Sequence, residues 1–131
     1  MTKININSTT PTQLDWLVAK CLYPKSVIYL KLNATFKSRK QEGIFLPDFN
    51  QSTNWAHGGP IIEREGIDIQ QVFCGMEGSF SEPCGWQAMR YTRSGVLNPP
   101  RQVANTSLIA AMRCYVTLKM GDVVEIPEEL L

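Results

Sequence analysis

The sequence contains one histidine, His57, and none of its four cysteines belongs to a Cys-x-x-Cys pair. A structural zinc site needs about four cysteine or histidine ligands, usually arranged in closely spaced pairs. These shortages exclude a Cys/His zinc centre. Nothing else in the sequence indicates a metal or another cofactor, so neither is predicted.

Long apolar runs are also missing, since no segment approaches the ~18 consecutive apolar residues of a membrane helix. The start of the chain, MTKININSTTPT, is polar and lacks the apolar stretch of a secretory signal. We therefore expect no membrane association and a location in the cytoplasm. A length of 131 residues suits one domain, residues 1–131, with a core of its own.

The sequence has no large excess of charge of either sign, because it contains 13 Lys and Arg residues and 12 Asp and Glu residues, for a net charge of +1. Proteins that bind duplex nucleic acid usually present a strongly basic face to the phosphates. The balance predicts no duplex nucleic acid partner, although it leaves a local basic patch open.

The cysteines are predicted to be reduced. Cys74 and Cys84 can face each other across a predicted hairpin, but a cytoplasmic compartment disfavours a disulfide there. Cys21 and Cys114 fall on the apolar faces of predicted helices, where cysteine acts as a small hydrophobic residue. We therefore expect four free thiols.

Residues 10–23 carry the signals of a helix start. Thr10 is a suitable N-cap, Pro11 fits the first helical position, and Gln13 completes a capping box. Pro24 is expected to end this helix. Residues 1–10 are expected to form a flexible arm. The buried face is predicted from apolar residues at helical spacing: Leu14, Leu17, Val18, Cys21 and Leu22.

A second helix is predicted between the N-cap Thr106 and Gly121. The order of the elements is shared with double-stranded-RNA-binding domains, which place basic residues at the start of their last helix. Here the first basic residue of the helix is Arg113, so the topology predicts no such function. The apolar stripe of this helix comprises Leu108, Ala111, Met112, Tyr115 and Leu118.

Strands are predicted at residues 26–32, 67–75 and 85–92, which are rich in β-branched and aromatic residues. The last two form a hairpin around the polar turn of residues 76–83, and the alternation places Trp86, Ala88 and Arg90 on one face. Residues 33–60 are predicted to form a long variable loop with a short strand at 44–46 and one helical turn after Ser52. Residues 93–106 are also expected to be loop.

These elements predict an α+β fold, in the order helix, strand, long loop, hairpin, helix. The simplest packing is a small antiparallel sheet with two helices packed on one face. After the second helix, residues 123–131 are expected to form a short extended run followed by a turn that starts with proline.

The segment of residues 52–66, STNWAHGGPIIEREG, is the strongest candidate for a binding site. Gly58, Gly59 and Pro60 predict a turn whose glycines let a backbone approach a ligand closely. Trp55 would be a stacking wall and Arg64 an anion partner. A purely structural turn is the alternative interpretation.

Two residues of the hairpin complete the predicted site, because Trp86 and Arg90 suit stacking on a base and pairing with a phosphate. The alternative is that the aromatic rings cover the open face of the sheet.

A catalytic His57 would need a nucleophile beside it, and no G-x-S-x-G motif occurs, so we predict no enzyme and no catalytic residue. The ligand-binding residues are therefore predicted to be Trp55, His57, Gly58, Gly59, Arg64, Trp86 and Arg90.

Three blocks of the chain resemble the NinX-like family of small bacteriophage accessory proteins: LDWLVAKC (14–21), STNWAHGGPIIEREGI (52–67) and SLIAAMRCYVTLKMGDVVEIPEELL (107–131). The family has no established molecular function. The resemblance implies a phage accessory protein in the cytoplasm of an infected enteric bacterium. Family members often have Asp and Gln where this chain has Asn54 and His57, which argues against an essential carboxylate or imidazole there.

From these residues and this resemblance we expect a non-enzymatic protein that binds a nucleotide or a nucleotide-derived signalling molecule of the host and thereby blunts host defence. The alternative is a protein–protein interaction module that inhibits or modulates a host or phage enzyme. We also expect a homodimer, because a small sheet with an open face often pairs.

Overall fold

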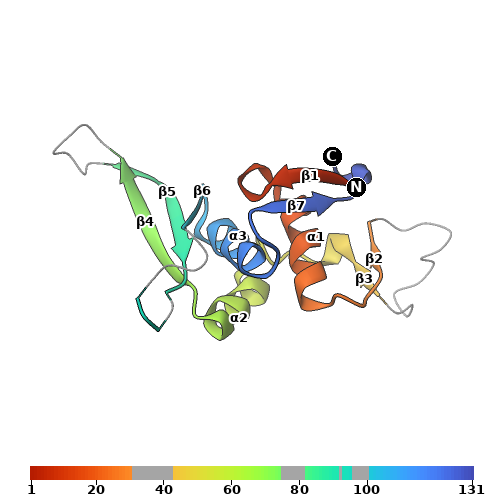
Figure 1. Cartoon of the computed structure of the whole chain (residues 1–131), viewed down its shortest axis with the longest axis horizontal. Coiled ribbons are helices and arrows are strands. Elements are labelled where there is room, and N and C mark those ends of the chain that lie inside the picture. Colours follow the sequence, from red (N-terminus) through yellow and green to blue (C-terminus); the bar gives the residue numbers. More distant parts are fainter. Residues whose placement is uncertain (31–42, 75–81, 92, 96–100) are drawn as a thin grey trace.

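The computed structural model describes residues 1–30, 43–74, 82–91, 93–95 and 101–131. This described part forms three α-helices and three small sheets in an elongated arrangement (Figure 1). The predicted α+β class is confirmed. The predicted turn at 76–83, the end of the predicted strand at 26–32 and the proline pair at 99–100 fall wholly or largely outside the described residues.

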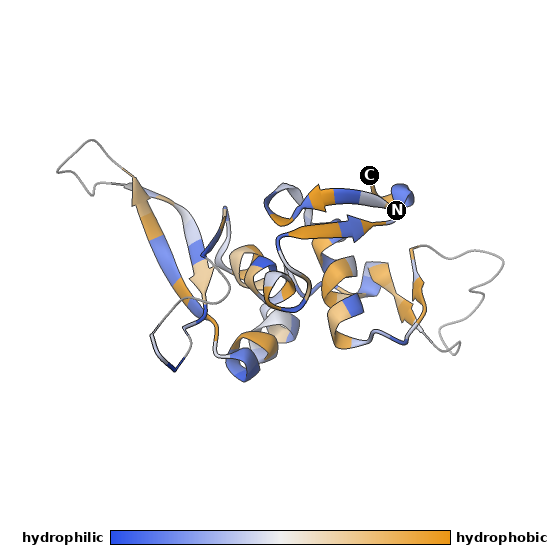
Figure 2. Cartoon of the chain, in the orientation of Figure 1, coloured by the Kyte–Doolittle hydropathy of each residue, from blue (hydrophilic) through white to orange (hydrophobic). Residues whose placement is uncertain are grey.

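Helix α3 (Ser107–Met120) lies at the centre of the molecule (Figures 1 and 2). Its N-cap is Thr106, as predicted, because the Thr106 hydroxyl accepts a hydrogen bond from the Ile109 backbone N–H at 3.2 Å. Helix α3 contacts the other two helices and one three-stranded sheet, so it is covered on several sides. Its buried residues are Leu108, Ala110, Ala111, Met112, Cys114, Tyr115, Val116 and Thr117.

Helix α1 (Pro11–Leu22) begins and ends as predicted. Thr10 and Gln13 form the capping box, with N–H···O distances of 3.3 and 2.9 Å. Helix α1 packs against α3 and β7 (Val123–Ile126). The prediction that two helices pack on one face of one sheet is wrong, because α3 lies between α1 and the three-stranded sheet (Figure 1).

Within the described ranges, no helix combines the length and the apolar content that a bilayer crossing demands.

The first residues of the chain are part of the core, so the predicted flexible arm is wrong. Strand β1 (Thr2–Asn5) pairs antiparallel with β7, which joins the two ends of the chain. The short helix η1 (Ile6–Ser8) follows, and the side chain of Ile6 is fully buried. The chain closes with η3 (Glu128–Leu130), whose N-cap is Pro127, as expected for a turn that starts with proline.

The three-stranded sheet is antiparallel in the order β4-β5-β6. It consists of β4 (Asp68–Cys74), β5 (Glu82–Met89) and β6 (Gln102–Ala104), and α3 packs against it. The predicted hairpin is confirmed, and Ile69 pairs with Ala88 while Gln71 pairs with Trp86. The prediction of loop throughout 93–106 is wrong, because β6 pairs with β5 directly after the proline pair.

A parallel pair of strands, β2 (Ile28–Tyr29) and β3 (Ile44–Phe45), forms the far end of the molecule (Figure 1). The short strand expected near residue 44 is confirmed. Helix η2 (Leu46–Asp48) follows β3. From residue 43 onward, the prediction of a loop up to residue 60 is therefore wrong, since β3, η2 and the first turns of another helix occupy this stretch.

That helix is α2 (Trp55–Glu65), and it replaces the predicted Gly-Gly-Pro turn. Asn54, rather than Ser52, is its N-cap, because the Asn54 side chain accepts a hydrogen bond from the Ala56 N–H at 3.0 Å. Gly66 ends it in the left-handed conformation, with φ of +65°. Pro60 lies inside the helix and cannot donate to it, so packing has to compensate for that missing hydrogen bond.

The packing of α2 explains why glycine stands at position 58. Gly58 and Ile61 are buried at helical spacing, and α2 packs against α3. A Cβ on Gly58 would overlap the Gln51 carbonyl oxygen and lie 2.6 Å from Cδ1 of Leu108. Glycine is therefore needed here for close approach to α3 and not for a turn. A Cβ on Gly59 would meet only Cε3 of Trp55, at 3.9 Å.

These two glycines supply a matched pair of variants. We expect Gly58→Ala to lower the free energy of unfolding by about 1–3 kcal/mol, because it overpacks the contact with α3. Gly59→Ala is expected to raise it by up to about 1 kcal/mol, because alanine favours a helix over glycine. Urea unfolding of both variants measures the difference. Equal destabilisation by both changes would contradict the helix.

Candidate ligand groove

A groove of about 720 Å³ lies between the β4–β5 hairpin, β6, η1 and the first half of α3. We call it the Trp86 groove. Three separate parts of the chain supply its walls, so it exists only in the folded protein. The lining residues that matter below are Thr9, Cys84, Gly85, Trp86, Val103 and Arg113.

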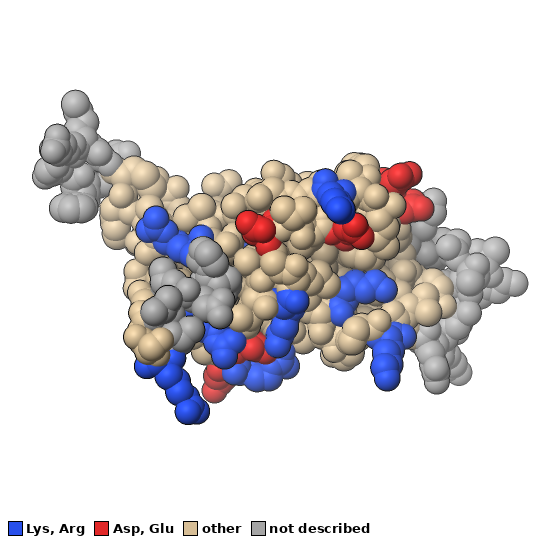
Figure 3. Space-filling view, viewed as in Figure 1, with Lys and Arg blue, Asp and Glu red and all other residues tan. Residues whose placement is uncertain are grey.

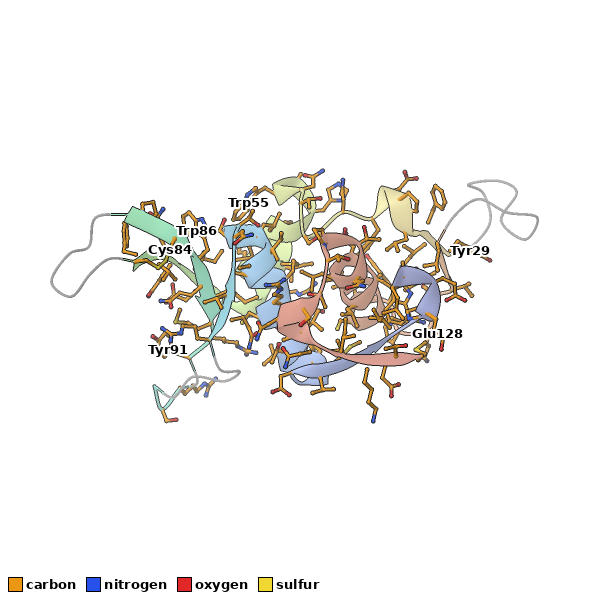
Figure 4. All side chains as sticks on the ribbon, turned by 90° about the horizontal axis from the view of Figure 1, so that it is seen from above. Tyr29, Trp55, Cys84, Trp86, Tyr91 and Glu128 are labelled. Atoms are coloured by element: carbon orange, nitrogen blue, oxygen red, sulfur yellow. A yellow bond between two sulfur atoms is a disulfide. The ribbon has the colours of Figure 1, made fainter. Side chains whose placement is uncertain are left out.

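Trp86 forms one wall of this groove. Its strand neighbour Gly85 has φ of +150°, and a Cβ there would lie 3.0 Å from the Ala104 carbonyl oxygen. Glycine therefore allows β6 to approach β5 closely at this point. The Trp86 side chain is half-buried and packs against the core while still lining the groove. Figure 4 shows Trp86 next to Cys84 on the hairpin.

Arg113 supplies the charge of the groove. Its guanidinium donates to the Val103 carbonyl oxygen at 2.9 Å, to the Thr9 carbonyl oxygen at 2.9 Å and to the Thr9 hydroxyl at 3.4 Å. All three acceptors are neutral, and among the described residues no carboxylate forms an ion pair with Arg113. Burial lowers the pKa of Arg113. An anion in the groove would stabilise the charged form.

Arg113 also has N–H groups that these three hydrogen bonds do not use. A guanidinium carries five N–H groups in a fixed plane. The three hydrogen bonds to Thr9 and Val103 hold this plane between η1 and β6. The remaining N–H groups are therefore fixed in direction before a ligand arrives, which reduces the entropy that binding would cost.

A disulfide joins Cys74 and Cys84 at the end of the hairpin where β4 finishes and β5 begins, and their Cα atoms are 5.5 Å apart. The prediction that all four cysteines are reduced is therefore wrong for this pair. It rested on the expected compartment, whereas the register of β4 and β5 brings the two residues within the usual Cα separation for a disulfide. Cys84 lines the Trp86 groove, so the crosslink also holds one wall of the groove.

The structure does not bring the seven predicted binding residues together. Trp86 alone among them lines the Trp86 groove. Trp55 lies on α2 with 53% of its surface exposed (Figure 4), and His57 is exposed on the same helix. The predicted turn glycines, Gly58 and Gly59, are helical, so residues 52–66 do not form a binding loop.

The two predicted arginines have other neighbours. The Arg64 guanidinium forms an ion pair with Glu65, with Nε and Oε1 3.4 Å apart, and the Arg64 side chain is 57% exposed. Arg90 follows β5 and lies close enough to Cys114 to oppose electrostatically the rise that burial causes in the pKa of that thiol. Neither arginine lines the groove with Trp86.

Arg113 is the residue that sequence reasoning missed. It interrupts an otherwise apolar stretch, LIAAMRCYV, in the middle of α3. A lone arginine in such a helix must find acceptors or an anion, because an unpaired buried charge is costly. That interruption was the available signal, but the sequence did not show which other segments would face it.

The cysteines provide a direct check of the hairpin. Burial raises the pKa of Cys21 and of Cys114 to about 11 each. The thiolate is the reactive form of cysteine. We therefore expect both thiols to resist alkylation in the native protein at about pH 8 and to react faster as the pH rises toward their pKa. In denatured protein, two thiols should react before reduction and four afterwards, as counted by mass spectrometry. Four reactive thiols without reductant would contradict the disulfide.

The comparison with curated proteins gives no match. A family model described as "Bacteriophage P22, NinX" matches residues 9–119, which include α1, α2, β4 to β6 and most of α3. The match spans most of the chain and covers nearly all the residues that line the Trp86 groove. The chain therefore belongs to the NinX family of bacteriophage P22.

Proposed function

We propose that this protein binds, without chemical conversion, a small anionic molecule that carries an aromatic ring, such as a nucleotide. The observation that carries the proposal is that Trp86 and Arg113 line one groove, where the arginine has only neutral acceptors among the described residues. An indole face stacks on a base, and a guanidinium pairs with a phosphate.

The size and chemistry of the groove support this ligand class. Its volume of about 720 Å³ is in the range of small-molecule sites. No Asp, Glu or His is among its described lining residues, so no lining group there is a general base. These features favour binding over catalysis.

The phage family gives this binding a biological setting. In an infected cell, a protein that holds a nucleotide-derived signal of the host would lower its free concentration and blunt the defence that it triggers. We propose the host cytoplasm as the location, where the Cys74–Cys84 disulfide would be an exception to the usual reduced state of cysteines. Figure 3 shows Lys and Arg side chains interspersed with Asp and Glu on one face of the molecule, and we propose no duplex nucleic acid partner. A homodimer stays a prediction.

A protein partner is the second candidate function. Phe73 on β4 and Val103 on β6 are each about half exposed, at 49% and 48%. Exposed apolar side chains on a sheet favour contact with another protein surface. On this alternative the molecule would modulate a host or phage enzyme, and the groove would receive a side chain of that partner.

Calorimetry with a panel of nucleoside monophosphates and cyclic dinucleotides tests the first function. We expect Trp86→Ala to weaken binding roughly tenfold or more, because stacking contributes about 1–3 kcal/mol per base. Arg113→Gln is expected to weaken binding by a similar factor, since a hydrogen bond to a charged group contributes about 1.5–3 kcal/mol. Circular dichroism checks that each variant is folded.

Two matched variants on α2 serve as controls. Trp55→Ala and Arg64→Gln remove the same residue types from exposed positions outside the groove, and they should leave affinity unchanged. If these two abolished binding while Trp86→Ala did not, the ligand would belong to the site predicted from residues 52–66. No binding of any panel member, together with capture of a protein from host lysate, would favour the second function.

A further inference from the structure

A second hollow lies between the end of α1, the β3–η2 segment and the start of α2. Its volume is about 420 Å³. We call it the aromatic hollow, because three aromatic side chains line it: Tyr23, Phe45 and Phe49. The rings of Tyr23 and Phe49 meet edge to face, with centroids 6.4 Å apart and planes at 78°.

Gln51 also lines this hollow and carries a buried acceptor. Gln51 is 8% exposed, and its side-chain oxygen Oε1 is buried without a hydrogen-bond partner among the described residues. The backbone of Gln51 is fixed, because its carbonyl group packs against Gly58. A buried acceptor without a partner is costly, so a ligand that brings an N–H donor would gain from meeting it.

The carboxylate that lines this hollow has the opposite sign to Arg113, the charged residue of the Trp86 groove. Asp48 contributes a carboxylate to its lining, and its described lining residues include no lysine or arginine. Aromatic faces attract cations through their quadrupole. An aromatic wall, a carboxylate and an unpartnered amide oxygen together suit an organic cation that carries N–H donors.

We propose that the aromatic hollow binds a guanidinium or alkylammonium group. The cation would rest against the rings of Tyr23 and Phe49 and donate one N–H to the Gln51 oxygen. This site is separate from the Trp86 groove and does not depend on the function proposed for that groove. A polyamine and an arginine side chain carry the same chemistry, so the test includes both sources.

His57, the only histidine of the chain, lines the aromatic hollow and can report on binding there. Proton NMR of its imidazole ring at constant pH therefore reports on this hollow without an assignment problem. The probes are methylguanidinium, spermidine and N-acetyl-arginine amide, and neutral methylurea serves as the isosteric control. We expect saturable shifts with the cations and none with methylurea, and the tighter of the last two cations identifies the source.

Three variants locate the bound cation. Tyr23→Leu changes a half-exposed ring and Asp48→Asn an exposed carboxylate, so neither should prevent folding. Each is expected to weaken methylguanidinium binding roughly threefold. Glu63→Gln removes an equal charge from an exposed position of α2 outside the hollow and should change nothing. Shifts that do not saturate, that are equal for methylurea, or that ignore Tyr23→Leu and Asp48→Asn would overturn the proposal.

Discussion

The burial of α3 is the constraint on which the rest of this structure depends. The helix contacts α1, α2 and all three strands of the β4–β6 sheet, so almost every position along it has a packing partner. Small residues then decide how close the partners come. Gly58 lets α2 approach Leu108, and Ala110 and Ala111 are fully buried within α3 itself.

The same burial creates the chemistry of the Trp86 groove. An arginine in the middle of a buried helix has to satisfy its guanidinium, and Arg113 does so with the Val103 and Thr9 carbonyl groups. It thereby connects β6 to the end of η1 while keeping its positive charge unbalanced among the described residues. The scaffold and the candidate site thus share one side chain. The aromatic hollow is lined by the Asp48 carboxylate and by Gln51 instead, so the ligands that we propose for the two sites have opposite charge.

The sequence predicted the elements whose signals are local. The capping box of Thr10 and Gln13, the N-cap Thr106 and the hairpin that carries Trp86 are all read from neighbouring residues, and the structure confirms them. The structure of the first residues was not predicted, because β1 is stabilised by β7 from the opposite end of the sequence. Strand β6 is similar, since three residues after a proline pair become a strand only beside β5.

The predicted site failed for a related reason. Gly58, Gly59 and Pro60 disfavour a helix individually, and a turn was the natural interpretation of that triplet. Tertiary packing reversed this preference, because Gly58, Ile61, Ile62 and Glu65 stand at helical spacing and Gly58 and Ile61 are buried. Likewise, Trp86 lies on a hairpin and Arg113 on a helix, and they line one groove only in the folded chain. No local sequence pattern encodes the relative position of these two elements.

The central claim is that Trp86 and Arg113 share one ligand, and two-dimensional NMR tests it most directly. The chain has three tryptophans, so its spectrum holds three indole N–H signals that Trp→Phe variants can assign. When adenosine 5′-monophosphate or a cyclic dinucleotide is added, the indole N–H of Trp86 and the Nε–H of Arg113 should shift together along one saturation curve, while Trp55 stays unchanged. A saturable shift of Trp55 with no change at Trp86 and Arg113 would contradict the account.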